Sequence, residues 1–224
     1  FEGYGMTEDC AYSFTSNAAH NAPGYVGVKM KGVEARLSPE GEVLIKSPGQ
    51  LVGYYKRLDL DAESFTPDGF FRTGDLGEFS PDGMLKLTGR AKELFKTAKG
   101  KYVAPAPIEN LINAHPMVEL SLVSGVGQPA AYAMILLSET LRPRQHESSV
   151  REQVNAELSR LLDEVNAAVA DYEQLKMFVI AREPWSIENG CLTPTMKIKR
   201  GRIEKMLEPE IERWYANKQK VLWQ

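Results

Sequence analysis

Short runs of alternating hydrophobic and polar residues characterise the first part of the chain. Stretches such as GYVGVKMKGVEARLS (residues 24–38) and GEVLIKSPG (residues 41–49) alternate in part and are interrupted by Gly and Pro. Alternation with a period of two is typical of β-strands, and Gly and Pro mark the turns between them. Residues 1–88 are therefore predicted to be β-rich.

Three similar tetrapeptides punctuate this region. They read SPEG at residues 38–41, TPDG at residues 66–69 and SPDG at residues 80–83. Pro at the second position and Gly at the fourth are favoured in type I turns. We expect each tetrapeptide to join successive strands of a sheet or barrel.

After Gly89 the pattern predicts strands mixed with helices. The apolar runs ELSLVSGVG (119–127) and AAYAMILLS (130–138) predict two strands with a turn between them. A further strand is expected at KMFVIA (176–181). These runs are richer in hydrophobic residues than the earlier strands, so the second part should contain a well-buried sheet.

Helices are indicated by a different spacing of hydrophobic residues. Over residues 149–175 they recur every three or four positions, which predicts the longest helix. A short helix is expected near residues 108–115, and another over residues 203–214. Pro209 should start a second segment within the last one, because proline suits a first helical turn and not an interior.

The predicted fold class is α+β, in two parts. Residues 1–89 form the β-rich part, and residues 90–224 form a small α+β domain of a common domain size. The joint between them is expected at residues 89–92, where the strand pattern ends.

Composition narrows the class of protein. The chain has 224 residues, 43% of them hydrophobic, which is enough for one large or two small buried cores. Its net charge of −3 argues against a dedicated nucleic-acid-binding protein. With only Cys10 and Cys191, neither a disulfide framework nor a cysteine metal site is expected, which favours a reducing cytosol. No apolar run is long enough to span a bilayer, and no signal peptide is recognised.

Two motifs in the β-rich part carry groups suited to a nucleotide. In YGMTE (residues 4–8), a tyrosine ring can stack on a base, a threonine can donate to a phosphate, and a glutamate can hold Mg²⁺. In RTGDLGEF (residues 72–79), Asp75 can accept hydrogen bonds from both hydroxyls of a ribose. Each motif also has a structural interpretation, an ordinary loop for the first and a turn cap for Asp75.

Two further motifs are basic. In LTGRAKELFKTAKGKYVAPAPIE, Arg90 offers a planar fork of donors, Lys92 lies at the predicted joint, and Gly100 allows a phosphorylated ligand to approach the backbone. In GCLTPTMKIKR, Lys197 can stabilise charge that develops between two reacting anions. The alternative for both motifs is a solvated basic loop. For the second, cations at the start of a helix are mildly unfavourable, which favours a functional role.

The order and spacing of these motifs resemble the back half of the adenylate-forming acyl-CoA synthetases. The resemblance covers nearly the whole chain, and FKTAKGKYVAPAPIEN and LTPTMKIKR look most like the long-chain fatty acyl-CoA synthetases. It implies that a fatty acid carboxylate attacks the α-phosphate of Mg-ATP, after which coenzyme A (CoA) takes the acyl group and AMP leaves. It also implies the β-rich end of a large N-terminal domain followed by a small mobile C-terminal domain, in a cytoplasmic enzyme that can contact membranes peripherally.

The resemblance assigns roles to individual residues. The nucleotide contacts fall on Tyr4, Gly5, Met6, Thr7, Asp75 and Arg90. Among these, Tyr4 matches the aromatic residue against adenine, Thr7 the phosphate contact, and Asp75 with Arg90 the ribose contacts. Glu8 matches the residue associated with Mg²⁺.

The remaining roles concern the movement of the small domain. Lys92 matches the hinge. Lys197 matches the catalytic lysine, which enters the site for adenylate formation and leaves for the second step. A second loop then approaches to form the CoA channel, and it comprises Lys99, Gly100, Lys101 and Tyr102. Such domain closure can order two reactions in one active site.

The sequence also departs from the family pattern. Many members have Ser-Gly-Lys at the catalytic lysine, where this chain has Thr-Met-Lys with Met196 replacing the glycine. The family's phosphate-binding loop and most of its acyl pocket belong upstream of YGMTE and are not in these residues. The chain, which starts with Phe, is therefore expected to be a fragment that does not complete adenylation alone.

Two other interpretations remain. Within the same superfamily, the parent could be a fatty acyl-AMP ligase or the adenylation domain of a carboxylic acid reductase, which differ in the second step. In another class, the chain could be a non-catalytic binding module that kept the fold. The presence together of Asp75, Arg90 and Lys197 argues against such decay, because losing one exposed polar residue costs little stability.

Overall fold

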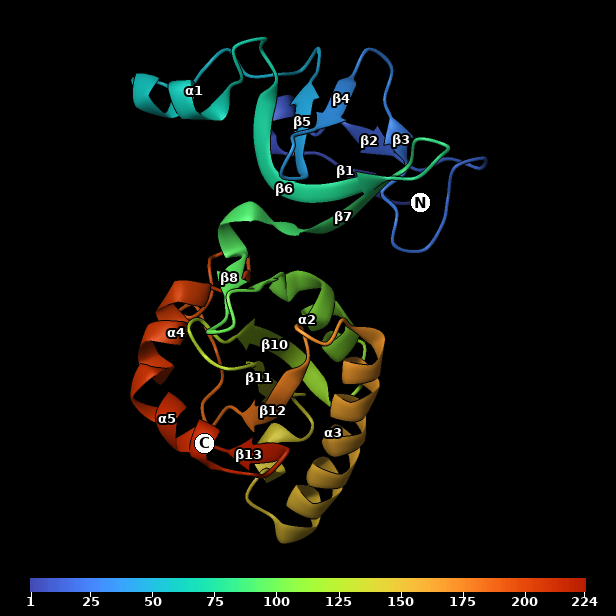
Figure 1. Ribbon diagram of the computed structural model, residues 1–224. Helices are drawn as coiled ribbons and strands as arrows, with labels where there is room; N and C mark the ends of the chain where they lie inside the picture. The colour runs from blue at the N-terminus through green and yellow to red at the C-terminus, as the bar shows by residue number, and fades with distance from the viewer. The chain divides into compact units, whose positions relative to one another are not determined.

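A computed structural model describes all of residues 1–224 and divides them into two compact units, Phe1–Glu93 and Leu94–Gln224 (Figure 1). The mixture of sheets and helices confirms the predicted α+β class. The sequence-based joint at residues 89–92 lies just before the division after Glu93. Its role as a hinge stays a prediction.

The Phe1–Glu93 unit is β-rich, as predicted. One sheet has the order β1-β2-β3 and the other β4-β5-β6-β7, all antiparallel. Their core contains Phe14, Val43, Ile45 and Leu85, each at most 1% exposed. The elements are β1 Gly3–Tyr4, η1 Thr7–Asp9, β2 Phe14–Thr15, β3 Val28–Lys29, β4 Glu34–Leu37, β5 Glu42–Lys46, α1 Leu58–Ser64, β6 Phe71–Phe79, β7 Leu85–Arg90 and η2 Ala91–Glu93.

The three predicted turns have one common geometry. In each, the N–H of the fourth residue donates to the carbonyl of the first at 2.9–3.0 Å, and the glycines Gly41, Gly69 and Gly83 have φ of 83–85°. This left-handed backbone favours glycine. The first and third turns join strands, as expected. The second instead leads from helix α1 into β6, and the sequence pattern did not predict that helix.

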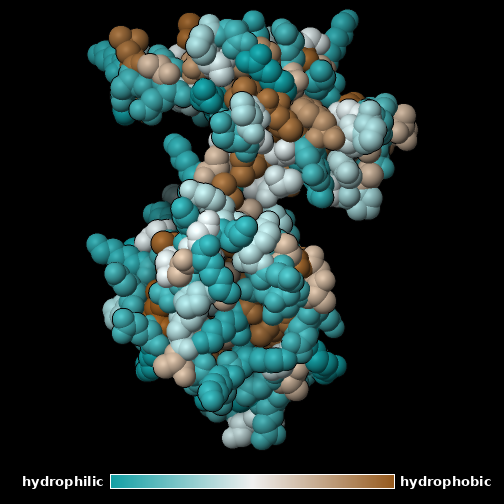
Figure 2. All heavy atoms as spheres, in the orientation of Figure 1, coloured by the Kyte–Doolittle hydropathy of each residue, from teal (hydrophilic) through white to brown (hydrophobic).

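Helix α1 and the segment before it carry exposed hydrophobic side chains. Val52, Tyr55 and Leu58 are almost fully exposed, and none of the α1 residues is buried. Hydrophobic atoms are visible at the end of the unit that carries α1 (Figure 2). A helix without a buried face gives no periodic pattern, which explains why it was missed.

The Leu94–Gln224 unit is a sheet covered by helices on both faces. The sheet has the order β10-β11-β12-β13, with one antiparallel and two parallel pairings. Its elements are β8 Phe95–Lys96, β9 Tyr102–Val103, α2 Pro105–Asn113, β10 Val118–Ser124, β11 Ala131–Leu137, η3 Arg142–Arg144, α3 Ser148–Ala168, β12 Leu175–Ile180, α4 Arg200–Leu207, η4 Glu208–Glu210, α5 Ile211–Ala216 and β13 Val221–Trp223. No helix of the chain is both long and apolar enough to cross a membrane.

The burial of strand β11 explains why its sequence is continuously hydrophobic. Every residue of β11 is buried, because alternate side chains enter two different cores. Ala133 and Ile135 pack with α2 and α3, whereas Tyr132 and Met134 pack with α4 and α5. A strand covered on both faces loses the alternation that marks a half-exposed strand.

The helix ends differ from the sequence prediction in two places. The long helix spans Ser148–Ala168 and not residues 149–175, because the Asn166 side chain bonds both the N–H and the carbonyl of Leu175, at 2.7 and 2.9 Å. These bonds turn the chain back, and Leu175 begins β12. The short helix begins at Pro105 and not at residue 108, since proline fits the first helical turn.

The C-terminal helices follow the prediction. The region expected to be helical over residues 203–214 falls within α4 and α5, which extend from Arg200 to Ala216 and are separated by the short 3₁₀ segment η4. Pro209 lies in that segment and so divides the two helices, as expected from its missing N–H.

Candidate functional site

An irregularity in β6 positions Asp75. In the pairing with β5, Leu44 faces Arg72 and Glu42 faces Leu76, so residues 73–75 lie opposite Val43 alone. Such a bulge bends a strand and redirects a side chain. Gly74 within it has φ of +73°, a conformation that glycine adopts without strain.

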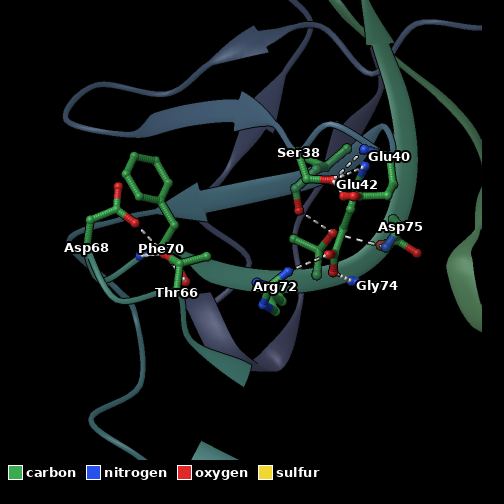
Figure 3. A network of polar contacts seen from close by, with 11 residues as sticks. Ser38, Glu40, Glu42, Thr66, Asp68, Phe70, Arg72, Gly74 and Asp75 are labelled. Carbon is green, nitrogen blue, oxygen red and sulfur yellow. Dashed lines mark hydrogen bonds and ion pairs between the residues drawn. The ribbon is translucent and has the colours of Figure 1, made fainter. Parts of the chain in front are cut away.

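Glu42 holds this bulge in place. Its carboxylate accepts a hydrogen bond from the Gly74 N–H at 3.0 Å and from Arg72 Nη1 at 3.2 Å (Figure 3). Thr73 Oγ1 donates to the Val43 carbonyl at 2.7 Å and accepts from the Asp75 N–H at 3.0 Å. No sequence motif singled out Glu42. Its position after a turn glycine resembles that of many solvated residues.

Asp75 is buried and connects two other residues of the predicted set. Tyr4 Oη donates to Asp75 Oδ2 at 2.6 Å, and Arg90 Nε donates to Asp75 Oδ1 at 2.7 Å. Asp75 is 7% exposed, and it faces Arg90 directly in the β6–β7 pairing. The structure therefore joins Tyr4, Asp75 and Arg90 in one cluster. The roles of these residues toward a nucleotide remain proposals.

The electrostatics of the cluster follow from burial and from the carboxylate. Burial raises the pKa of Tyr4, and its hydrogen bond to Asp75 raises it further. The hydrogen bond to Asp75 also raises the pKa of Arg90. Both groups therefore keep their protons, and the two oxygens of Asp75 accept from a neutral hydroxyl and a cation.

A pocket of about 560 Å³ lies beside this cluster, within the Phe1–Glu93 unit. Its lining includes Thr73, Gly74 and Arg90, the neighbours of Asp75. Met6, Glu8, Tyr54 and Lys92 also line it. The pocket thus brings the YGMTE motif, the Asp75 bulge and the predicted hinge residue to one cavity.

The YGMTE motif is folded tightly at this pocket. A side chain at Gly5 would lie 2.6 Å from the backbone of Ala11, so only glycine fits there. Met6 and Glu8 line the pocket, whereas Thr7 is exposed in the 3₁₀ turn Thr7–Asp9. Both the structural and the ligand-binding interpretation of this motif are therefore compatible with its geometry.

Glu8 is suited to a divalent cation only together with other ligands. Its Oε1 accepts a hydrogen bond from Tyr54 Oη at 3.0 Å, and burial followed by this bond raises the pKa of Tyr54. No group of three or more His, Cys, Asp or Glu side chains in the chain is arranged to hold a metal ion. A single carboxylate fits Mg²⁺ that arrives with nucleotide phosphates, because that ion keeps several ligands from water and substrate.

In the Leu94–Gln224 unit, the predicted CoA-channel residues form the β8–β9 hairpin. Lys99, Gly100, Lys101 and Tyr102 are all exposed. The Gly100 N–H donates to the Thr97 carbonyl, and Gly100 has φ of +77°. Two backbone bonds tie this hairpin to the β10–β11 turn, from Ala98 N–H to the Gln128 carbonyl at 2.9 Å and from Gly127 N–H to the Lys96 carbonyl at 3.0 Å.

Lys197 follows a turn of the same design. The Met196 N–H donates to the Thr193 carbonyl at 2.9 Å, and the Thr193 N–H donates to the Lys197 carbonyl at 2.8 Å. The fourth position, which is glycine in the other turns, is Met196 with φ of +62°. The Lys197 side chain is exposed. The chain therefore presents the lysine immediately after a strained residue.

We predict that Met196→Gly stabilises this chain by about 1 kcal/mol. The substitution removes the cost of a left-handed conformation, and little packing is lost because Met196 is 60% exposed. Urea unfolding measures the change. Gly83→Met is the matched control and should destabilise by a similar amount, because a Cβ at Gly83 meets nothing within 4 Å and only the backbone is strained. A loss of stability in Met196→Gly would contradict this account.

The chain is similar in sequence to known enzymes. A family profile described as the AMP-binding enzyme C-terminal domain matches residues 93–219. The chain is 33% identical to long-chain-fatty-acid–CoA ligase FadD15 of Mycobacterium bovis and 31% identical to long-chain-fatty-acid–CoA ligase 1 of Cavia porcellus, over 96% of its own length in both cases. It spans 38% and 34% of those two proteins.

A solved structure has a similar fold. The adenylation domain of carboxylic acid reductase from Segniliparus rugosus, solved with AMP and a co-purified carboxylic acid, superposes with a TM-score of 0.68 at 25% sequence identity. The match covers 85% of this chain and 32% of that one. Sequence and fold therefore indicate the same group of proteins.

Proposed function

Because this chain belongs to the AMP-binding, adenylate-forming enzymes, we propose that it is the C-terminal part of a long-chain fatty acid–CoA ligase. The observation that carries this proposal is the similarity to long-chain ligases over 96% of the chain. The substrates of the full enzyme are a fatty acid, Mg-ATP and CoA. Its proposed location is the cytoplasm, with peripheral contact to membranes.

In the proposed reaction, a carboxylate oxygen attacks the α-phosphate of ATP, and pyrophosphate leaves. The sulfur of CoA then attacks the acyl carbonyl of the adenylate, and AMP leaves. Asp75 and Arg90 hold the ribose, Tyr4 lies against the adenine, and Thr7 contacts the phosphate. Glu8 contacts the Mg²⁺ that enters with ATP. The lining of the pocket by Arg90 and Glu8 supports the assignments of these two residues.

The two basic loops serve the two steps in turn. Lys197 enters for adenylate formation, where its ammonium group stabilises the charge shared by carboxylate and phosphate. The hairpin of residues 99–102 then approaches to line the CoA channel, with Lys92 as the hinge. The exposure of Lys197, Lys99 and Lys101 supports roles toward ligands that come and go.

A second candidate keeps adenylation and changes the acceptor. The similarity to a carboxylic acid reductase adenylation domain favours transfer of the acyl group to a carrier protein as this alternative. The two functions share every residue assigned above except the channel loop. Only the second half-reaction separates them.

The test measures acid-dependent ATP–pyrophosphate exchange in the full-length enzyme with acids from acetate to oleate, followed by CoA consumption. We expect long-chain acids to drive exchange and CoA to be consumed, with AMP as a product. Exchange without CoA consumption would favour the carrier-protein alternative. No exchange with any acid would favour a non-catalytic binding module. The isolated chain should be inactive.

A further inference from the structure

A buried ion pair lies next to the Lys197 loop, and the predicted chemistry does not use it. Arg200 Nη2 lies 2.9 and 3.0 Å from the two carboxylate oxygens of Glu109. The two side chains are only 16% and 12% exposed. Among the ion pairs of this chain it is unusually shielded from solvent, so it is screened less than a surface pair.

Both partners also bond the backbone of Val123 in β10. The Val123 N–H donates to Glu109 Oε1 at 2.7 Å, and Arg200 Nη1 donates to the Val123 carbonyl at 2.9 Å. Because β10 is an edge strand of its sheet, these groups have no neighbouring strand there. The ion pair therefore occupies the place of another strand and fixes Arg200 to the sheet.

The ion pair lies at the base of the Lys197 loop. Arg200 is the first residue of α4, three positions after Lys197. The base of the loop is closed by the Lys199 N–H, which donates to the Cys191 carbonyl at 2.8 Å, and by a bridge between Leu192 and Ile198, whose side chains pack with the core. Arg200 adds a charged anchor, which bonds the start of α4 to β10.

The other loop does not depend on this anchor. The β8–β9 hairpin is tied to the β10–β11 turn by its own backbone bonds, through Ala98 and Gly127. Glu109 lies in α2, which follows that hairpin, but none of the hairpin bonds passes through the ion pair. Loss of the pair should therefore affect the two loops unequally.

We propose that Arg200 is a positioning residue for adenylate formation, held by Glu109 so that Lys197 is presented at a fixed place on the small domain. This inference rests on the proposed function. A planar guanidinium suits the role because it bonds a carboxylate and a carbonyl simultaneously, which the ammonium group of lysine does not reproduce. An apolar pair would fill the same space without fixing direction, since hydrophobic contacts are non-directional.

The experiment uses the full-length enzyme and three readouts: acid-dependent ATP–pyrophosphate exchange, thioester formation from preformed acyl-adenylate, and the thermal midpoint. In Arg200→Lys we expect exchange to fall tenfold or more while thioester formation stays within twofold. The double variant Glu109→Leu/Arg200→Met replaces the buried pair with apolar side chains and leaves no unpaired buried charge, although Val123 loses both of its side-chain partners. We expect its thermal midpoint to recover in part and its exchange to stay low.

Arg142→Lys is the matched control. Arg142 forms an ion pair with Glu119 at 2.7 Å in the same unit, with 21% and 33% exposed side chains. This substitution should leave both half-reactions unchanged. If exchange recovers together with the thermal midpoint in the double variant, or both half-reactions fall equally in Arg200→Lys, the positioning role is wrong.

Two comparisons separate this inference from the proposed function. Absence of acid-dependent exchange in the unmodified enzyme would overturn the proposed function itself. Exchange that is lost in Lys197→Ala but retained in Arg200→Lys would overturn only the positioning role of Arg200.

Discussion

Replacing Lys197 with alanine in the full-length enzyme should lower acid-dependent ATP–pyrophosphate exchange by about a hundredfold or more, the usual effect of removing a group that stabilises a charged transition state. Thioester formation from preformed acyl-adenylate should persist, because in the proposed mechanism the lysine leaves the site before that step. One substitution thus lowers the first half-reaction and leaves the second in place. Single-turnover assays of each half-reaction measure the difference.

The structure indicates that the Lys197 side chain can be removed without breaking other contacts. The ammonium group of Lys197 forms no ion pair or hydrogen bond within the chain. The hydrogen bonds between Lys197 and Thr193 involve the backbone N–H and carbonyl of Lys197. The substitution therefore should not alter the fold. Lys199→Ala removes a charge two residues away, and we expect it to leave exchange within twofold. Normal exchange in Lys197→Ala would mean that the basic loop is only a solvated surface.

The elements that sequence patterns predicted well are those whose pattern has one physical cause. The helix Ser148–Ala168 buries one regular stripe of hydrophobic residues, from Val150 to Val165. The spacing of this stripe is the periodic pattern from which the helix was predicted. Its end was misplaced because Val169 and Tyr172 continue the spacing after the helix has stopped. Side-chain bonds from Asn166 decide that end, and no hydrophobic pattern records them.

The candidate site shows a similar limit. The SPDG turn pairs Phe79 with Leu85, and extending that register evenly would place Asp75 opposite Gly89. A shift between Leu76 and Gly77 moves the pairing by one residue and places Arg90 opposite Asp75. The sequence does not show where such a shift occurs, so strand register alone could not predict that Asp75 and Arg90 face each other. The two residues were identified from the resemblance of their motifs.

Replacing Asp75 with alanine should weaken ATP binding to the full-length enzyme by about 3 kcal/mol, roughly a hundredfold. The proposed ribose contact consists of two hydroxyl groups that donate to the carboxylate, and hydrogen bonds to a charged group are the stronger ones. The substitution also releases Arg90 and the Tyr4 hydroxyl from their shared acceptor. Calorimetric titration with ATP measures the affinity.

Two further variants show whether a loss of ATP affinity is specific to the Asp75 carboxylate. Asp82→Ala removes an exposed carboxylate from the turn of the same hairpin, where it accepts a hydrogen bond from Ser80 Oγ at 2.6 Å, and ATP affinity should not change. Asp75→Asn keeps one acceptor oxygen but sets an amide group against the donors Tyr4 Oη and Arg90 Nε. We therefore expect its affinity to lie near that of Asp75→Ala. Unchanged ATP affinity in Asp75→Ala would reduce Asp75 to a structural residue that joins β6 to β7.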